Sequence, residues 1–110
     1  MTTITFYRDE DDKYYSFESS GHAGFAFKGK DIVCAGISTL CINFVNSVEK
    51  LTASSCIVES DEKLGFLSVT VKDYDRTEVQ LLFKSLSLGL NGIQEEYSKH
   101  LKLTNRRCKP

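Results

Sequence analysis

One histidine and one cysteine flank a glycine-bearing stretch of the chain and could together perform nucleophilic catalysis. His22 follows an expected strand, and Cys34 falls in the first turn of an expected helix. The unpaired N–H groups of that turn and the helix dipole favour a thiolate over a thiol. An imidazolium at His22 would stabilise the thiolate and later protonate a leaving amine, while the same N–H groups could hold an oxyanion. The parts that a cysteine–histidine hydrolase needs are therefore available within thirteen residues.

Spacing alone also permits a purely structural role for the same residues. Cys34 shares one helical stripe with Cys41 and Phe44, so it could be a small buried hydrophobic residue at the start of a core helix. His22 follows a glycine and could be an ordinary turn residue. The pattern of residue types leaves both alternatives open.

The neighbours of the pair carry the same ambiguity. Asp31 is well placed to cap the helix and could also orient His22. Ser38 lies one turn beyond Cys34 and by default is a helix residue satisfied by its own backbone. Phe25 and Phe27 lie in the glycine loop and either enter the core or form an apolar flap over a groove.

The pattern along the chain predicts two pairs of strands, each pair followed by an amphipathic helix. Strands are expected where apolar and polar residues alternate, and helices where apolar residues recur every three or four positions. The expected strands are 3–7, 14–20, 56–59 and 64–72, and the expected helices are 31–51 and one that starts near 75. This β-β-α-β-β-α order predicts an α+β fold with a mostly antiparallel sheet and two helices packed on one face.

Local patterns refine this expectation. In the second strand, Tyr15 and Phe17 are expected to point inward. Asp75 and Glu78 have the spacing of a capping box at the start of the second helix. Glycines inside that helix cost about 1 kcal/mol each relative to alanine, so tight local packing is expected at Gly89 and Gly92.

Composition limits the class of protein. The chain has 110 residues, 41% hydrophobic residues and a net charge of −1, which favours one domain and argues against an extended nucleic-acid-binding face. No run approaches eighteen uninterrupted apolar residues, so no membrane span is expected. The first residues lack a signal-peptide pattern, which predicts a cytoplasmic protein. Four cysteines without metal-ligand spacing are then expected to be free thiols, with no metal and no cofactor.

The domain is expected to span residues 1–98, followed by a basic C-terminal tail, residues 99–110. The tail carries lysines and arginines and no acidic residue. Such a tail is most often solvated and frayed. A weak contact with RNA or an acidic partner is the alternative.

The chain closely resembles the ribosomal-processing cysteine proteases, the Prp family. The resemblance rests on Gly21-His22-Ala23 and on Asp31-Ile32-Val33-Cys34-Ala35-Gly36-Ile37-Ser38. The neighbourhood of Asn43–Asn46, the run Leu88-Gly89-Leu90 and the run Glu95-Glu96-Tyr97 fit the family too. With matching length and element order, the resemblance covers nearly the whole chain.

Membership would imply an activity and a set of site residues. Members of the family remove a short N-terminal extension from a bacterial large-subunit ribosomal protein, the twenty-seventh of the L series, just after an aromatic residue. They also form homodimers. The resemblance implies a catalytic dyad of His22 and Cys34 supported by Asp31 and Ser38. The substrate is expected to bind as an extended peptide against Gly21, Ala23, Phe25, Phe27 and Ala35.

Two other classes of function remain as alternatives. A noncatalytic ribosome-associated assembly factor would use the basic tail for RNA and the domain for protein contact. A thiol redox sensor would need a partner thiol for Cys34, but Cys41 lies roughly 10 Å away along the helix at 1.5 Å per residue. An intrahelical disulfide is therefore excluded.

Overall fold

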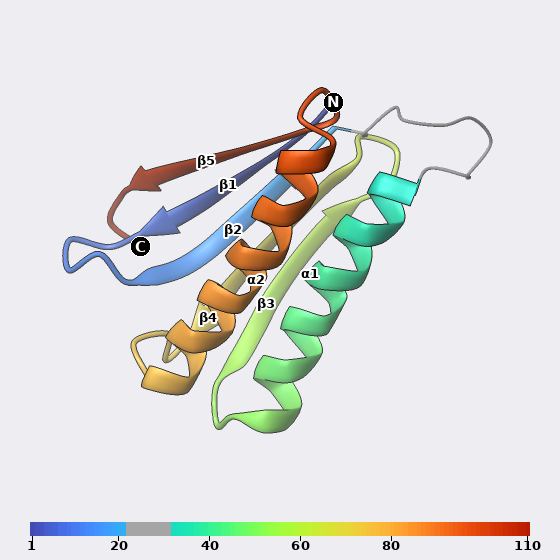
Figure 1. Ribbon diagram of the computed structural model, residues 1–110. Helices are drawn as coiled ribbons and strands as arrows, with labels where there is room; N and C mark the ends of the chain where they lie inside the picture. The colour runs from blue at the N-terminus through green and yellow to red at the C-terminus, as the bar shows by residue number, and fades with distance from the viewer. Residues whose placement is uncertain (22–31) are drawn as a thin grey trace.

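The computed structural model describes residues 1–21 and 32–110 as two layers, a sheet and a pair of helices. The sheet has the strand order β3-β4-β2-β1-β5, and both helices lie on one of its faces (Figure 1). The elements are β1 (Thr2–Arg8), β2 (Tyr14–Ser20), α1 (Ile32–Leu51), β3 (Ser55–Asp61), β4 (Phe66–Lys72), α2 (Thr77–Glu96) and β5 (Leu101–Arg107). The predicted α+β class is confirmed, with one further strand at the C-terminal end.

The core lies between the sheet and the helices because the apolar periodicities of both point there. Each helix has an apolar stripe at helical spacing, and the central strands contribute alternate residues. Phe44 of α1 is the centre of an aromatic cluster, with its ring 4.6 Å from that of Phe83 and 5.6 Å from that of Phe17. The stripes that become buried are Val33, Ile37, Cys41, Phe44 and Val48 in α1 and Val79, Phe83, Leu86 and Leu90 in α2.

An irregularity in the first hairpin decides which tyrosine joins the main core cluster. Tyr7 pairs with Ser16 and Arg8 pairs with Tyr14, so Tyr15 is the extra residue of a β-bulge. Tyr14 consequently stacks on Phe83, with ring centroids 5.5 Å apart, while Tyr15 packs against Tyr7 and Tyr74 instead. Tyr15 is buried as expected, at 7% exposure, but it lies outside the main core cluster, which strict alternation could not show because it does not reveal a bulge. Phe17 faces the core as expected.

The segment expected to be a frayed tail contains strand β5. This strand runs parallel to β1, with Thr2 opposite Leu101, and Leu101 is only 1% exposed. The backbone N–H of Leu103 also donates to Gln94 Oε1 of α2 at 2.6 Å. A seven-residue basic strand has little periodicity of its own. Its pairing with the first strand of the chain was therefore missed.

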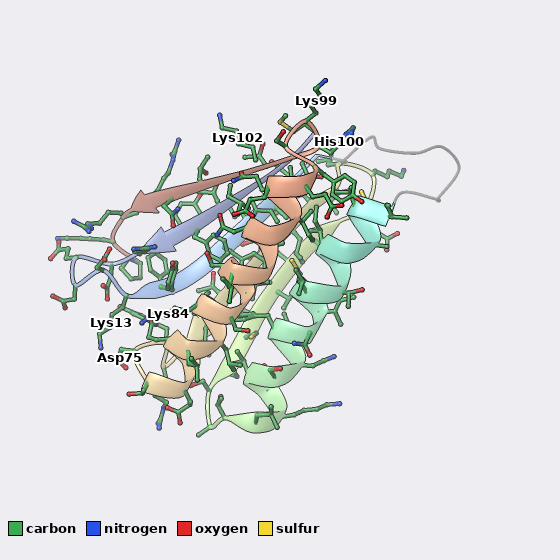
Figure 2. All side chains as sticks on the ribbon, viewed as in Figure 1. Lys13, Asp75, Lys84, Lys99, His100 and Lys102 are labelled. Carbon is green, nitrogen blue, oxygen red and sulfur yellow. The ribbon has the colours of Figure 1, made fainter. Side chains whose placement is uncertain are left out.

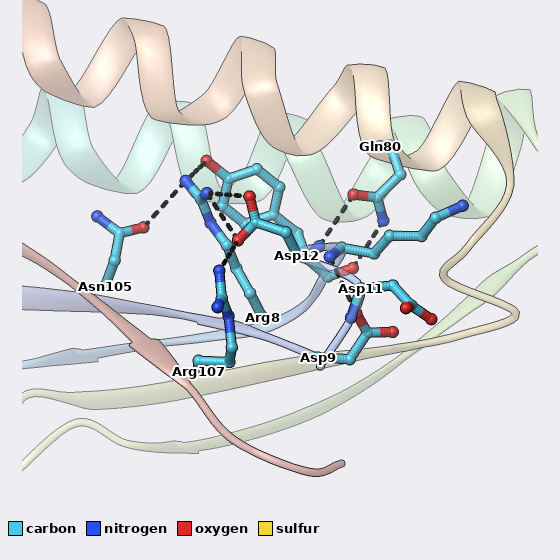
Figure 3. A network of polar contacts seen from close by, with 9 residues as sticks. Arg8, Asp9, Asp11, Asp12, Gln80, Asn105 and Arg107 are labelled. Atoms are coloured by element: carbon cyan, nitrogen blue, oxygen red, sulfur yellow. Dashed lines mark hydrogen bonds and ion pairs between the residues drawn. The ribbon is translucent and has the colours of Figure 1, made fainter.

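A polar network fixes the far end of β5 to the turn between β1 and β2 (Figure 3). Arg107 Nη2 donates to Asp12 Oδ1 at 2.9 Å, and Arg8 donates to Asn105 Oδ1 at 3.4 Å and to Asp12. The backbone N–H of Cys108 donates to the carbonyl of Arg8 at 2.8 Å. The acidic turn therefore binds part of the basic C-terminal segment.

The second helix starts differently from the prediction. Its N-cap is Arg76, and no side chain makes a capping hydrogen bond, so the expected capping box of Asp75 and Glu78 is not formed. Gln80 instead ties the first turn to the sheet, because its amide exchanges hydrogen bonds of 2.7–2.9 Å with the backbone of Tyr14 and donates to the carbonyl of Tyr74. Docking on β2 therefore replaces a local cap.

The helices approach closely where one of them carries a glycine. A Cβ atom at Gly89 would lie 3.0 Å from Leu40 Cδ1, and one at Gly36 would lie 3.3 Å from Ile93 Cδ1. At Gly92 the space is open. The expectation of tight packing is thus confirmed at Gly89 and wrong at Gly92.

α1 is long and apolar enough to cross a membrane by length and composition alone. In the structure its Val33–Val48 stripe is buried against the sheet and α2. A core helix of a soluble protein passes the same test, so this is weak evidence for a span. The absence of a membrane span stays a prediction.

Candidate active site

A cavity of about 310 Å³ opens at one end of the sheet, beside the start of α1. The start of β1 and the end of β2 form one side of the cavity. α1 forms a second side, and the turn between β3 and β4 forms a third. Figure 1 shows this turn at the same end of the sheet as the first turn of α1. The described lining residues are Thr2, Ser19, Gly21, Cys34, Ile37, Ser38, Cys41, Asp61, Glu62, Gly65, Phe66 and Leu67.

Cys34 is the residue of this cavity with a nucleophilic side chain near a helix start. It is the third residue of α1, packs partly against the core and is half-buried rather than enclosed. Val33 is buried in the core and Ile32 is exposed, and Cys34 lies at the boundary between the buried and the exposed face of the helix. The structure thus supports an accessible thiol over the alternative of a fully buried one.

Cys41, two turns further along α1, lines the same cavity but has the properties of a core residue. It is 1% exposed, and burial raises the pKa of its thiol to about 12. At neutral pH this thiol is protonated and a poor nucleophile. Of the two cysteines that line the cavity, the position of Cys34 is the one compatible with catalysis.

The first turn of α1 provides an electropositive backbone beside Cys34. The first N–H groups of a helix have no acceptor within the helix, and they carry partial positive charge. The first turn of α1 contains no acidic residue that would neutralise this charge. Such a site favours a thiolate and an oxyanion close to it.

Gly21 and Ser38 line the cavity, and Ala35 does not. Gly21 has φ +87°, and a Cβ atom there would overlap the carbonyl oxygen of Met1, so only glycine fits at this end of β2. Ser38 is exposed one turn beyond Cys34. Ala35 is exposed on α1 and is absent from the described lining residues.

The remaining predicted site residues are His22, Ala23, Phe25, Phe27 and Asp31, and they lie outside the described residues. The dyad, the aromatic flap and the helix cap therefore stay predictions.

The turn between β3 and β4 is the part of the site that sequence reasoning missed. The residues of this turn lie between the expected strands 56–59 and 64–72, and no role at the site was predicted for them. In the structure Asp61 Oδ1 accepts the backbone N–H groups of Lys63 at 3.0 Å and Leu64 at 3.2 Å, and Gly65 has φ +62°. This tight turn brings Asp61 and Glu62 to the cavity. No local pattern of residues places this turn at the cavity, since its position depends on how β4 pairs with β2.

The arrangement offers a thiol, a helix start and a partly apolar cavity, which together suit acyl transfer. Within residues 1–21 and 32–110, no group of three or more histidine, cysteine, aspartate or glutamate side chains could hold a metal ion.

Comparison with known proteins gives one consistent family. The model of the family described as cysteine protease Prp matches residues 1–102. The ribosomal processing cysteine protease Prp of Bacillus subtilis is 31% identical over 108 residues, which cover 94% of this chain and 96% of that protein. That of Mycoplasma genitalium is 34% identical over 84 residues, with coverages of 76% and 80%.

Solved structures agree with the sequence relatives. The ribosomal processing protease Prp of S. aureus with a covalently linked product peptide has a TM-score of 0.91 at 28% identity, covering 96% of this chain and 100% of that one. The S. aureus protease with a substrate peptide gives a TM-score of 0.86 at 27% identity, with the same coverages.

Proposed function

The chain belongs to the Prp family of cysteine proteases, and from this premise we propose that it processes a ribosomal protein. The substrate is the precursor of a bacterial large-subunit ribosomal protein, the twenty-seventh of the L series. The enzyme removes its N-terminal extension by cleavage after an aromatic residue. The observation that carries the proposal is the position of Cys34, half-buried at the start of α1 and open to a cavity.

Cys34 and His22 are the proposed catalytic dyad. The Cys34 thiolate attacks the scissile carbonyl and forms a tetrahedral oxyanion next to the first N–H groups of α1. The C–N bond then breaks, a thioester forms on Cys34, and imidazolium at His22 donates a proton to the leaving amine. His22 next accepts a proton from water, whose hydroxyl attacks the thioester and releases the carboxylate product. Asp31 and Ser38 support this pair.

The cavity is compatible with an aromatic side chain next to the scissile bond. Its apolar lining includes Ile37 and Leu67, and its volume of about 310 Å³ lies at the small end of ligand pockets. It can therefore receive a large side chain of an extended peptide. In this proposal Gly21, Ala23 and Ala35 bind the peptide while Phe25 and Phe27 close over it.

We also propose a homodimer on the family resemblance, a cytoplasmic location, and a weak RNA contact through the basic tail. Arg107 and Lys109 make ion pairs with Asp12 and Glu10, at 2.9 and 3.6 Å. Among the described residues, no ion pair involves the other tail cations, Lys99, Lys102 and Arg106. Figure 2 shows Lys99 and Lys102 around the start of β5.

The test is cleavage of the precursor protein, followed by mass spectrometry. Wild-type protein is expected to release one N-terminal peptide that ends in an aromatic residue. Cys34→Ala and His22→Ala are each expected to lower the rate by roughly 10³-fold or more. Cys108→Ala is the matched control because Cys108 is an exposed thiol outside the cavity. Full activity of Cys34→Ala would sink the proposed mechanism.

A further inference from the structure

We propose that Glu62, assisted by Asp61, makes the enzyme select peptides with a lysine or arginine within about three residues of the scissile bond. This inference rests on the proposed proteolysis and specifies its substrate class. Among the described residues that line the cavity, Asp61 and Glu62 are the charged ones, and both are acidic. A peptide that enters the cavity therefore meets negative charge on the β3–β4 side.

The two carboxylates differ in what they already bind. Asp61 uses Oδ1 to accept the N–H groups of Lys63 and Leu64, which holds the turn. Glu62 accepts no side-chain hydrogen bond and makes no ion pair within residues 1–21 and 32–110. The carboxylate of Glu62 is therefore available to a substrate, and that of Asp61 adds negative charge from a fixed position.

The size of the cavity sets the distance along the substrate. A compact space of about 310 Å³ is roughly 8 Å across, and an extended peptide advances roughly 3.3 Å per residue. A peptide residue whose side chain reaches Glu62 therefore lies two or three positions from the carbonyl attacked by Cys34. A lysine or arginine has a long stem that can lie on the apolar lining while its charge meets the carboxylate.

Among the described residues, the charge of the adjacent Lys63 does not remove this preference. Lys63 follows Glu62 in the turn, but it is exposed and is absent from the described lining residues. A solvent-exposed ion pair typically contributes about 0.2–1 kcal/mol, which corresponds to a factor of about 1.4 to 5. A preference of about fivefold for lysine over alanine is therefore expected at the favoured position.

The experiment uses fluorogenic peptides with one aromatic residue before the scissile bond. Lysine, alanine or glutamate is placed at each of three positions on either side of that bond. Wild-type protein is expected to give a lysine-to-glutamate ratio of kcat/KM of about tenfold or more at one position. Salt at about 0.5 M should reduce the ratio, because a Debye length of about 4 Å screens the pair.

Charge reversal identifies the residue responsible. Glu62→Lys is expected to invert the lysine-to-glutamate ratio, mainly through KM. Glu59→Lys is the matched control, because Glu59 lies on the same hairpin, is exposed and does not line the cavity. It should leave the ratio near the wild-type value. Glu62 is changed rather than Asp61 because Asp61 holds the turn. Equal shifts in the two variants would overturn the local contact.

Binding to Cys34→Ala protein separates this inference from the proposed function. Labelled lysine and glutamate peptides are titrated and followed by fluorescence anisotropy. Tighter binding of the lysine peptide, lost in Glu62→Lys/Cys34→Ala, supports the inference even if wild-type protein cleaves nothing and the proposed function fails. Equal affinity for both peptides at every position refutes the inference, whether or not wild-type protein is a protease.

Discussion

Two glycines of α2 allow the packing of the two helices to be tested by the same substitution in two environments. A Cβ atom at Gly89 would lie 3.0 and 3.1 Å from the two terminal methyl carbons of Leu40 on α1. A Cβ atom at Gly92, one turn later, would meet nothing within 4 Å. Alanine at either position gains the same helix propensity, so the two variants differ only in the contact with α1.

The expected free energies of unfolding follow from these contacts. Gly92→Ala should stabilise the protein by about 1 kcal/mol, the cost of a glycine inside a helix. Gly89→Ala gains the same amount but forces Leu40 or α1 to move, and overpacking typically costs about 1–3 kcal/mol. The two variants should therefore differ by about 2 kcal/mol. For 110 residues this is roughly 8 °C in Tm, at about 4 °C per kcal/mol.

Urea unfolding followed by circular dichroism measures the free energy of unfolding of both variants, with one m-value shared between them. Leu40→Ala is then combined with each glycine variant. It should relieve Gly89→Ala and have an additive effect with Gly92→Ala, because only the first pair is in contact. Equal stabilisation by Gly89→Ala and Gly92→Ala, or additive behaviour of both pairs, would refute the close approach of α1 and α2.

Three further predictions concern the termini and the thiols. Hydrogen bonds from Arg107 and Arg8 hold the pKa of Asp12 below its ordinary value of 3.8, so its stabilising contribution is complete above that value and is lost as pH falls through the lowered pKa. Asp12→Asn should therefore flatten the decline of Tm below about pH 4, and Asp11→Asn, at the adjacent exposed position, should not. Because burial raises the pKa of the Cys41 thiol to about 12, iodoacetamide at about pH 8 should modify exposed Cys108 and spare Cys41 in native protein. If peptide mass spectrometry finds Cys41 alkylated without denaturant, the burial of Cys41 is contradicted. Leu101→Ala should lower the free energy of unfolding by about 2–5 kcal/mol, because Leu101 is 1% exposed. Arg107→Ala, at an exposed ion pair, should lower it by about 1 kcal/mol or less. Similar urea midpoints for the two variants would show that β5 is not anchored.

Most of the fold could be predicted from local patterns, because each element repeats its apolar residues at its own period. The stripe from Val33 to Val48 predicted α1, and the alternation around Phe6 and Phe17 predicted the first hairpin. The errors occur where the chain departs from its period. A bulge placed Tyr15 outside the main core cluster. Strand β5 pairs with the first strand of the chain and carried no clear alternation.

The family and the candidate nucleophile can be recognised from the order of residues alone. The motifs around His22 and Cys34 are short, contiguous and specific, so they can be recognised without a structure. Tertiary structure decided which cysteine is accessible: Cys34 and Cys41 share one helical stripe, yet packing encloses only Cys41. It also brought the turn with Glu62 to the cavity, through the pairing of β4 with β2. Long-range strand pairing and burial depend on the whole chain, and for that physical reason no local pattern of residues contains them.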